Sequence, residues 1–370
     1  MVIIAFLMLF AVAIGSLFYL WTRFHKFYLI EQIAGERKKL PWLLAAVPVL
    51  LLVLLFFVKT VSATIIALHL FVFWLLSDFI YWLVKKVSKK TWKRYYAGIA
   101  AILITTVYLC IGWYYAHHVY ETDYTIHTTK DLGTEKLRIA MFADSHMGCT
   151  FDGDGFAEHV KTMQKTNPDV VVIVGDFVDD DSKKVDMVKS CKALGEMKTT
   201  YGVYYVFGNH DKGYFNSRDF TTEELRKELE KNGIMILEDE NISLTEKICL
   251  IGRQDRSEEQ REDGGKRKEM SELVANMDED TYKIVLDHQP HDFAAQAEAG
   301  VDLVLCGHTH GGQMFPVGIT GELSGENDKT YGLETRKNTN YIVTSGISDW
   351  AIKFKTAAIA EFVIIDVEGK

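Results

Sequence analysis

Cysteine is scarce in this chain, and it contains neither internal repeats nor low-complexity tracts. Only five of the 370 residues are cysteine, and they are scattered without a close pair or a spacing typical of a metal site. The sequence therefore indicates no disulfide framework, although an isolated disulfide in an oxidising compartment stays open. Glycine and proline are not enriched and 48% of the residues are apolar, which excludes collagen-like and disordered chains.

Basic residues are in deficit over most of the chain. Residues 121–370 contain 29 Lys or Arg and 47 Asp or Glu, a net charge of −18, whereas residues 1–120 contain 12 and 3, a net charge of +9. A nucleic-acid-binding surface needs a basic stripe that displaces counterions from phosphates, so the acidic balance argues against a nucleic-acid partner. It favours an enzyme that binds cations.

Apolar runs too long for a soluble core helix fill the first 120 residues, which excludes a wholly soluble protein. Four runs reach the length that a helix needs to cross a hydrocarbon core about 30 Å thick: Val2–Trp21, Leu40–Val58, Val61–Val84 and Tyr95–Ala116. The alternative for the first run is a cleavable signal peptide, but the run lacks a basic start and three more runs follow it. The sequence therefore predicts a transmembrane region of four helices over residues 1–118.

Lysine and arginine are concentrated in two links between these runs, residues 22–39 and 85–94. By the positive-inside rule, both links face the cytoplasm. The amino terminus and everything after the fourth run then lie outside, which predicts a multi-pass protein of the cell membrane with an extracytoplasmic globular domain. Asp78 is the one acidic residue within the runs, and its position near a helix end predicts a side chain that reaches the interface or caps the helix.

From residue 137 onward, short β-branched and aliphatic runs alternate with helical stretches. This pattern predicts an α/β domain with largely buried strands. The predicted strands are 137–143, 169–174, 203–207, 248–251, 283–286, 302–306, 341–344 and 358–365, and the predicted helices are 156–166, 183–198, 222–232 and 291–299. We therefore expect a linker over residues 119–136 and an α/β domain over residues 137–370. The charged stretch 253–270 breaks the rhythm and is predicted to be a surface loop or lid.

Polar motifs directly follow five of the predicted strands. They are Asp144-Ser145-His146, Gly175-Asp176-Phe177-Val178-Asp179, Gly208-Asn209-His210-Asp211, Asp287-His288 and Gly307-His308-Thr309-His310-Gly311-Gly312-Gln313. In open α/β sheets, groups just beyond the carboxyl ends of the strands gather in one crevice. The five motifs are therefore predicted to converge.

The ligand types in these motifs indicate a pair of metal ions. Carboxylates, imidazoles and an amide oxygen form a borderline-hard set that suits Mn²⁺, Fe or Zn²⁺ rather than Ca²⁺ or a thiolate-bound ion. In an extended segment, residues i and i+2 project to the same side. Asp144 with His146, and His308 with His310, can therefore each reach one centre or two adjacent ones.

Each motif has a simpler explanation when it is taken alone. Asp-x-His and Gly-Asp are common in surface turns, Asn-His-Asp could cap a helix, and His288 could be a core histidine with satisfied hydrogen bonds. Two histidines in a glycine-rich turn, as in residues 307–313, have no packing role. All five simple explanations would have to hold together in this order, so the sequence favours the metal site.

The ordered pattern Asp-x-His, Gly-Asp-x-x-Asp, Gly-Asn-His-Asp, His and Gly-His-x-His resembles the calcineurin-like metallophosphoesterase superfamily over about residues 136–367. The longer Gly-His-Thr-His-Gly-Gly-Gln ending and the apolar amino-terminal region resemble its membrane-anchored bacterial YkuE/YaeI-like branch. The resemblance implies a β-sandwich of two mixed sheets flanked by helices, with two metal ions at the strand ends.

The resemblance also implies a role for each residue that matches a motif. It assigns three ligands to the first ion, three to the second and one to both: Asp144, His146 and His310; Asn209, His288 and His308; and Asp176. His210 would lie beside the scissile phosphate and contact the attacked or the leaving oxygen.

The implied chemistry is hydrolysis without a protein nucleophile. Two divalent ions about 3.5–4 Å apart lower the pKa of a shared water enough to supply hydroxide near neutral pH, and they neutralise charge on the phosphoryl oxygens. His210, when protonated, would stabilise that charge or protonate the leaving oxygen. Asp211 either orients this imidazole or is a solvated surface carboxylate.

One residue departs from the pattern of the phosphoprotein phosphatases in this superfamily. They usually carry Arg directly after Gly-Asp-x-x-Asp, where it grips the phosphate, but position 180 is Asp, which disfavours a phosphoprotein substrate. Arg253 and Arg256 are alternatives for phosphate contacts, unless their charged stretch is a solvated loop. Asp179 is expected to support a ligand rather than to bind a metal itself.

These observations predict a membrane-anchored, metal-dependent phosphoric ester hydrolase with two divalent ions, Mn, Fe or Zn. The expected substrate is a phosphodiester, phosphomonoester or pyrophosphate of the envelope or of a lipid carrier, with membrane lipids as partners. The first alternative is a catalytically inactive metal-binding sensor or scaffold on the membrane, which the complete ligand set disfavours. The second is a transporter with an accessory soluble domain, which the absence of broken-helix signals disfavours.

Overall fold

The computed structural model describes residues 2–89, 92, 94–215, 217–260 and 265–370. Lys90 and Lys93 of the basic link, and residues 261–264 of the charged stretch, lie outside the described residues. The chain divides into two compact units, Met1–Gly112 and Trp113–Lys370. The division agrees with the change of composition near residue 120.

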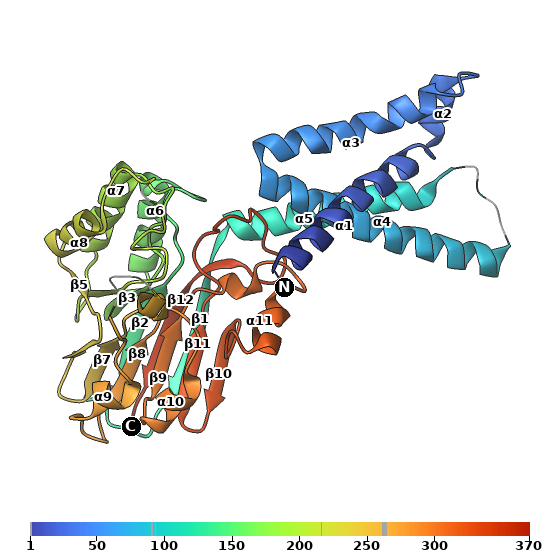
Figure 1. The fold of residues 1–370 in the computed structure, drawn as a ribbon. Coiled ribbons are helices and arrows are strands. Elements are labelled where there is room, and N and C mark those ends of the chain that lie inside the picture. Colours follow the sequence, from blue (N-terminus) through green and yellow to red (C-terminus); the bar gives the residue numbers. More distant parts are fainter. Residues whose placement is uncertain (1, 90–91, 93, 216, 261–264) are drawn as a thin grey trace. The chain divides into compact units, whose positions relative to one another are not determined.

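Five helices make up the apolar part of the chain (Figure 1): α1 (Val2–Phe24), α2 (Tyr28–Ala34), α3 (Leu40–Val58), α4 (Thr60–Ser88) and α5 (Tyr96–His117). Among the described residues, three of these helices, α3, α4 and α5, are long and apolar enough to cross a membrane. The side chains of residues 2–11 and 13 in α1 lie outside the described part. The first predicted span, Val2–Trp21, therefore stays a prediction.

Asp78 lies inside α4 and is held by partners from other helices. Its carboxylate lies 2.9 Å from Arg23 Nε, and it accepts hydrogen bonds from the hydroxyls of Tyr19 at 2.8 Å and Tyr95 at 2.5 Å. The indole of Trp74 donates to the Tyr95 hydroxyl at 2.9 Å. The acid thus ties α1, α4 and the segment before α5 together, instead of capping a helix as the sequence suggested.

Two six-stranded mixed sheets form the second unit, as the resemblance implied. The first has the order β1 (Val119–His127), β12 (Ala360–Glu368), β2 (Lys136–Phe142), β3 (Val170–Val174), β4 (Val203–Val206) and β5 (Ile234–Ile236). The second has the order β10 (Gly332–Arg336), β11 (Thr339–Val343), β9 (Leu303–Cys306), β8 (Tyr282–Leu286), β7 (Ile248–Gly252) and β6 (Glu240–Ser243). All eight predicted strands are present. Within the sheets, β2 to β5 run parallel, and so do β7, β8, β9 and β11.

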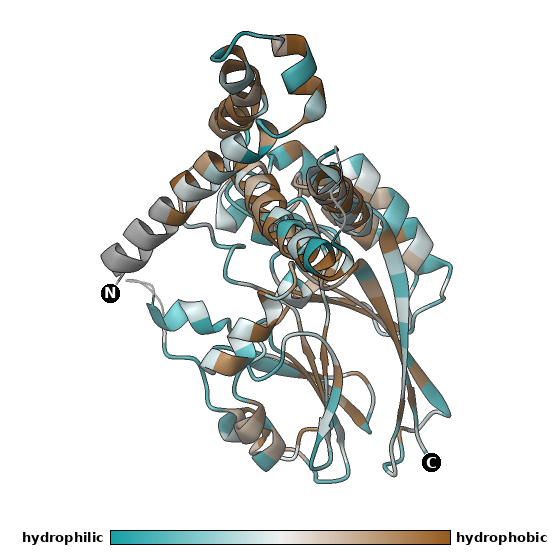
Figure 2. Cartoon of the chain, turned by 90° about the vertical axis from the view of Figure 1, so that its right-hand side faces the viewer, coloured by the Kyte–Doolittle hydropathy of each residue, from teal (hydrophilic) through white to brown (hydrophobic). Residues whose placement is uncertain are grey.

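The strands are buried on both faces, which explains their nearly continuous apolar sequences. On β2, Ile139 and Met141 belong to the core between the sheets, whereas Ala140 and Phe142 belong to the core under the helices. Figure 2 shows hydrophobic residues along the strands and hydrophilic residues on many of the loops. The helices that pack on the sheets are α6 (Gly153–Gln164), α7 (Lys184–Gly195) and α8 (Thr222–Lys231) on the first sheet, and α9 (Met270–Val274) and α10 (Phe293–Glu298) on the second.

The segment 119–136, which the sequence suggested as a linker, contains strand β1. β1 pairs in parallel with β12 over its whole length, from Val119 with Ala360 to His127 with Glu368. Its sequence alternates polar and apolar residues, because one edge of the sheet and much of one face meet solvent. The membrane-side helix α5 and the first strand are therefore separated by a single residue, His118.

The five cysteines are all free thiols in the structure. Cys191, Cys249 and Cys306 are buried in the hydrophobic packing, where a thiol acts as a small apolar side chain. Burial raises the pKa of Cys306 well above its ordinary value, so this thiol stays protonated.

The pairing of β2 with β12 predicts how stability depends on pH. Asp366 on β12 accepts hydrogen bonds from Arg138 Nε and Nη2 on β2, both at 2.8 Å, and these bonds hold the pKa of Asp366 below its ordinary value of 3.8. The stabilisation is therefore present above the ordinary pKa and is lost as the pH falls through the folded-state pKa. We expect Asp366→Asn to cost about 1 kcal/mol at pH 7, because the pair is bidentate but partly exposed, and to cost less at pH 2. Thermal unfolding of the full chain in detergent at both pH values measures this, and an equal loss at both would contradict it.

Candidate metal centre

The motif residues lie just past the carboxyl ends of five strands from both sheets. Asp144 and His146 follow β2, Asp176 follows β3, Asn209 and His210 follow β4, His288 follows β8, and His308 and His310 follow β9. Parallel strands end at the same edge of a sheet, and the two sheets pack face to face, so residues far apart in the sequence meet there. The structure brings all eight side chains together at this edge.

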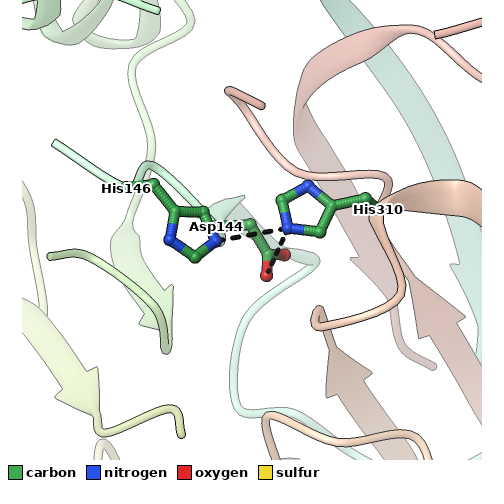
Figure 3. Close-up of side chains that lie close together, drawn as sticks. All are labelled: Asp144, His146 and His310. Carbon is green, nitrogen blue, oxygen red and sulfur yellow. Dashed lines mark hydrogen bonds and ion pairs between the residues drawn. The ribbon is translucent and has the colours of Figure 1, made fainter. Parts of the chain in front are cut away.

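The first group consists of Asp144, His146 and His310, whose ligand atoms lie within 4.8 Å of one another. Figure 3 shows the two imidazoles turned toward each other above the carboxylate. Nε2 of His146 lies 3.2 Å from Nε2 of His310, and the latter lies 3.8 Å from Asp144 Oδ1. Two nitrogen lone pairs at this distance repel each other unless a proton or a cation lies between them, so the arrangement suits a metal ion.

The second group consists of Asp176, His288 and His308, also with ligand atoms within 4.8 Å of one another. Nε2 of His288 lies 3.2 Å from Asp176 Oδ2. The amide oxygen of Asn209 joins this group, at 2.8 Å from His308 Nδ1 and 3.2 Å from His288 Nε2. One carboxylate, two imidazoles and one amide oxygen thus point at a common place.

Asp176 connects the two groups. Its Oδ2 atom lies 3.2 Å from His288 Nε2 in the second group and 3.8 Å from His146 Nε2 in the first. Its Oδ1 atom accepts a hydrogen bond from the backbone N–H of His210 at 2.8 Å. One carboxylate therefore lies between both groups and also fixes the start of the His210 loop.

The protonation states fit a cation at each group. Burial lowers the pKa of His308 to about 3 and that of His310 well below its ordinary value, so both imidazoles are neutral and keep a free lone pair. Burial alone would raise the pKa of Asp176, but the adjacent His288 outweighs it and holds that pKa far below its ordinary value. Nδ1 of His310 is buried without a hydrogen-bond partner, so no protein group competes for this ring. The ionised Asp176 and the neutral His308 and His310 are in the state that divalent transition metals bind, whereas Asp176 raises the pKa of His288 well above its ordinary value, so a metal ion there must displace a proton.

Two of the histidines are fixed through their Nδ1 atoms. Nδ1 of His288 lies 2.8 Å from the backbone oxygen of Val174 and donates to it, which turns Nε2 toward Asp176. Nδ1 of His146 lies 3.3 Å from Asp179 Oδ2. Asp179 thus supports His146 from outside both groups, in agreement with the expectation from the sequence.

The backbone that carries the candidate ligands is strained. Asp144, His146, Asp176, His308 and His310 have φ values of 54°, 36°, 52°, 71° and 49°, in the left-handed region that side chains rarely adopt. Gly208 allows this geometry, since a Cβ there would lie 2.3 Å from Asp176 Oδ1. Such strain persists only where the surrounding structure compensates for it.

Asp211 provides part of this compensation, in a role that the sequence did not reveal. Its buried carboxylate accepts hydrogen bonds from the backbone N–H groups of Asp176 at 2.8 Å, Val178 at 3.0 Å and Gly208 at 2.7 Å. Neither reading of Asp211 from the sequence is correct, because it is neither solvated nor bonded to the His210 ring. It clamps the turns after β3 and β4, and only the folded backbone shows which N–H groups it reaches.

A cleft of about 580 Å³ opens beside His210. Its lining contains three acids (Asp179, Asp180 and Asp181), His210, Ser217 and the aromatic residues Tyr214, Phe215 and Trp350. The ring of His210 lies 5.1 Å from that of Tyr214 and 5.2 Å from that of Trp350, centroid to centroid. Among the described residues, this lining contains no lysine or arginine, so a bound phosphate would need cations from elsewhere to balance its charge.

The predicted alternatives for phosphate contacts are not at the site. Arg253 is only 3% exposed; its Nη1 lies 2.9 Å from Asp287 and 3.1 Å from Asp292, so its charge is already balanced. Arg256 begins a short 3₁₀ helix, Arg256–Gln260, and is not in the lining of the cleft. The described residues of the charged stretch 253–270 are thus partly buried, so this stretch is neither a solvated loop nor a lid. Asp180, where phosphoprotein phosphatases usually carry Arg, accepts backbone hydrogen bonds from Tyr214 and Phe215 and shapes the aromatic wall of the cleft.

Comparison with known proteins identifies the family. The sequence model described as Calcineurin-like phosphoesterase matches residues 137–312. An uncharacterised metallophosphoesterase of Aquifex aeolicus is 31% identical over 258 residues, which are 67% of this chain and 91% of that protein. The chain belongs to the calcineurin-like metallophosphoesterase family. In this chain, the motif residues all lie at one edge of the sandwich.

Some relatives extend well beyond the segment that matches this chain. One from Campylobacter jejuni is 30% identical over 235 residues, which are 63% of this chain and 60% of that protein. A zebrafish protein, described as a transmembrane protein with a metallophosphoesterase domain, is 32% identical over 238 residues, which are 62% of this chain and 52% of that protein. The chain therefore spans only about half to two thirds of the length of these two relatives.

The position of Asp176 between the two groups predicts metal contents. We expect Asp176→Asn to weaken metal binding at least about tenfold, because both groups lose a shared negative ligand. His210→Ala should keep the metal of the parent protein, because the His210 side chain belongs to neither group. Elemental analysis of the dialysed full chain measures both, with Asp154→Asn on the exposed surface of α6 as the matched control. Parental metal content in Asp176→Asn would refute the shared role.

Proposed function

We propose that this metallophosphoesterase is a membrane-bound hydrolase of phosphate esters that works with two divalent cations, Mn, Fe or Zn. The observation that carries the proposal is the pair of ligand groups joined by one carboxylate, with Asp176 Oδ2 at 3.2 Å from His288 and 3.8 Å from His146. In this proposal three residues hold each ion and one holds both: Asp144, His146 and His310; Asn209, His288 and His308; and Asp176.

Divalent cations in these groups would supply an activated water near neutral pH and would neutralise charge on the phosphoryl oxygens. The cleft repels a phosphate electrostatically, because its described lining has three aspartates and no basic side chain. The side chains of Asp179 and Asp180 are engaged with His146 and with backbone N–H groups, so they hold the site rather than the substrate. Cations are therefore a requirement for phosphate binding as well as for the reaction.

His210 is proposed as the acid that protonates the leaving oxygen. Burial lowers its pKa, so the imidazole is neutral in the free site. An arriving phosphate is negatively charged and favours the protonated ring, which can then give its proton to the leaving oxygen. The hydrogen bond from the His210 backbone N–H to Asp176 at 2.8 Å fixes the ring beside the two groups.

The substrate is proposed to be a phosphodiester or pyrophosphate of the envelope or of a lipid carrier, with a phosphomonoester as the further possibility. Asp180 stands where an arginine would grip a phosphoprotein, and it shapes an aromatic wall instead. Tyr214 and Trp350 on this wall suit an organic leaving group rather than a polar peptide surface. Assignment to the YkuE/YaeI-like branch remains part of this proposal.

Activity assays test the function. We expect the full chain to hydrolyse chromogenic phosphodiesters or monoesters, to lose this activity on chelation and to regain it with Mn²⁺. His210→Ala should lower kcat by about 10²–10⁴-fold without loss of metal, because it removes only the proton donor. His127→Ala, an exposed histidine on β1, is the matched control and should retain full turnover. Full activity after exhaustive chelation would exclude the two-cation hydrolase, whereas metal binding without any turnover would favour the inactive sensor or scaffold.

The membrane arrangement is part of the proposal: four spans, with the basic links in the cytoplasm and the catalytic domain outside. Three helices with the length and hydropathy of spans support it, together with the basic residues at the end of α4. Membrane lipids are then constant neighbours of the catalytic domain, and a nucleic acid is not an expected partner.

Cysteine labelling of intact cells tests this orientation. On a background with Cys110→Ser and Cys149→Ser, we expect Glu326→Cys, in an exposed part of the catalytic domain, to react with a membrane-impermeant maleimide. Lys89→Cys, directly after α4, should react only after the cells are permeabilised. The reverse pattern would place the catalytic domain in the cytoplasm.

A further inference from the structure

Exposed apolar side chains gather beside the metal centre. Among the described residues 119–370, nine large apolar side chains are exposed. Six of them form a group that we call the apolar rim: Phe215, Phe315, Val317, Ile319, Leu323 and Trp350. Their exposed fractions range from 49% for Trp350 to 81% for Leu323. Such a concentration marks an interaction surface, because exposed apolar residues are otherwise scattered singly.

The rim is continuous with the cleft at the metal centre. Phe215 and Trp350 line the same cleft as His210. The segment that carries the other four residues is tied to the Trp350 loop by Gln313, whose amide donates to the backbone oxygens of Ile352 at 3.0 Å and Phe354 at 2.9 Å. A further hydrogen bond joins the Phe315 N–H to the Thr356 hydroxyl at 3.1 Å. The segments 313–315 and 352–356 therefore lie side by side, next to the loop that carries Trp350.

Helix α11 (Gly318–Ser324) leaves its large apolar side chains uncovered. None of its residues is buried. Ile319 and Leu323 are four residues apart, so they share one face of the helix, and that face is exposed. A short helix that leaves its apolar face uncovered gains stability only when something apolar covers it.

The end of α5 indicates what covers the rim. Its last residues, from Trp113 to His117, belong to the same compact unit as the catalytic domain. Val119, two residues after the end of α5, pairs with Ala360, the residue at which the segment that follows Trp350 enters β12. Trp113 and Tyr114 are 51% and 50% exposed, and such aromatic residues are enriched at the surface of a bilayer. If α5 crosses a bilayer, its exit from the lipid lies at these aromatic residues, within the unit that also holds the Trp350 loop.

We propose that the apolar rim inserts into the adjoining lipid leaflet. There it contacts the acyl chains of a membrane-embedded phosphate ester, and the headgroup of this ester reaches the metal centre. The proposal rests on the function proposed above and narrows its substrate to an amphiphile. Burial of six large apolar side chains in lipid favours a position of the cleft at the lipid surface.

Photochemical labelling tests the contact without any catalysis. The full chain is placed in nanodiscs of phosphatidylglycerol that contain a phospholipid with a diazirine in its acyl chain. After illumination, tandem mass spectrometry should find lipid adducts in residues 315–323 and none around Val185, an apolar residue of α7 with 56% exposure. Equal labelling at both places, or adducts confined to the helices before residue 113, would overturn the proposal even if the enzyme is active.

Kinetics test the selection of substrate. Hexadecyl p-nitrophenyl phosphate in mixed micelles and ethyl p-nitrophenyl phosphate share one reacting phosphate and one leaving group, and differ only in the chain. We expect the ratio of their kcat/KM values to fall on the order of tenfold in Val317→Ser/Leu323→Ser, because two apolar side chains no longer contact lipid. Val185→Ser matches Val317→Ser in residue type and in exposure (56% against 59%) and should keep the parental ratio.

The outcomes separate the two proposals. A fall in the ratio of the two kcat/KM values in Val317→Ser/Leu323→Ser, together with lipid adducts in the parent protein, supports the proposal that the rim contacts lipid. An unchanged ratio refutes it while leaving the phosphoesterase intact, whereas no turnover of either ester refutes the hydrolase and leaves the labelling result to decide the rim. A second copy is the competing occupant: a dimer in native mass spectrometry that Val317→Ser/Leu323→Ser dissociates, without lipid adducts, would replace the lipid assignment.

Discussion

The negative charge of Asp176 lies where almost no solvent reaches it, and much of the domain is arranged to hold it there. A buried carboxylate is stable only beside opposite charge or hydrogen-bond donors, and Asp176 has His288, His146 and the His210 N–H around it. Its backbone takes a left-handed conformation that Asp211 clamps through the N–H groups on either side of the turn. Since the partners come from both sheets, the site exists only when the sandwich is complete. The sheets therefore position the chemistry, and the glycines at the strand ends leave room for it.

The sequence predicts much of this arrangement because its strongest signals are local. Strands buried on both faces need nearly continuous β-branched and aliphatic runs, and residues that follow such strands gather at one edge, so eight strands and the motif positions could be found without a structure. Strand β1 was missed because it is half-exposed and finds its partner, β12, more than 200 residues away. The functions of Asp211 and Arg253 were missed for a related reason. A buried carboxylate or guanidinium is read correctly only when its neighbours are known, and those neighbours are backbone N–H groups in one case and Asp287 and Asp292 in the other.

Position 180 shows how one substitution changes the surroundings of a shared site. An arginine there would offer positive charge to a phosphate, whereas Asp180 accepts hydrogen bonds from the N–H groups of Tyr214 and Phe215 and fixes that loop. The cleft therefore has an aromatic wall beside His210, and it has no arginine at position 180 to bind the phosphate. Electrostatic attraction of the phosphate is then left to the cations of the two ligand groups. In the proposed function, discrimination between substrates falls to the organic part of the ester, which would meet the aromatic side chains.

The connection between α5 and β1 contains no flexible linker. Only His118 separates the helix from the strand, and its ring stacks on Tyr114 and meets Tyr120 edge to face. A long flexible linker would let the domain search the solution, whereas here the first strand follows the helix almost directly. If α5 crosses the bilayer, the catalytic domain therefore begins at the lipid surface. In the proposed function, this connection favours esters whose phosphate lies at the membrane, and such a preference needs no basic residue in the cleft.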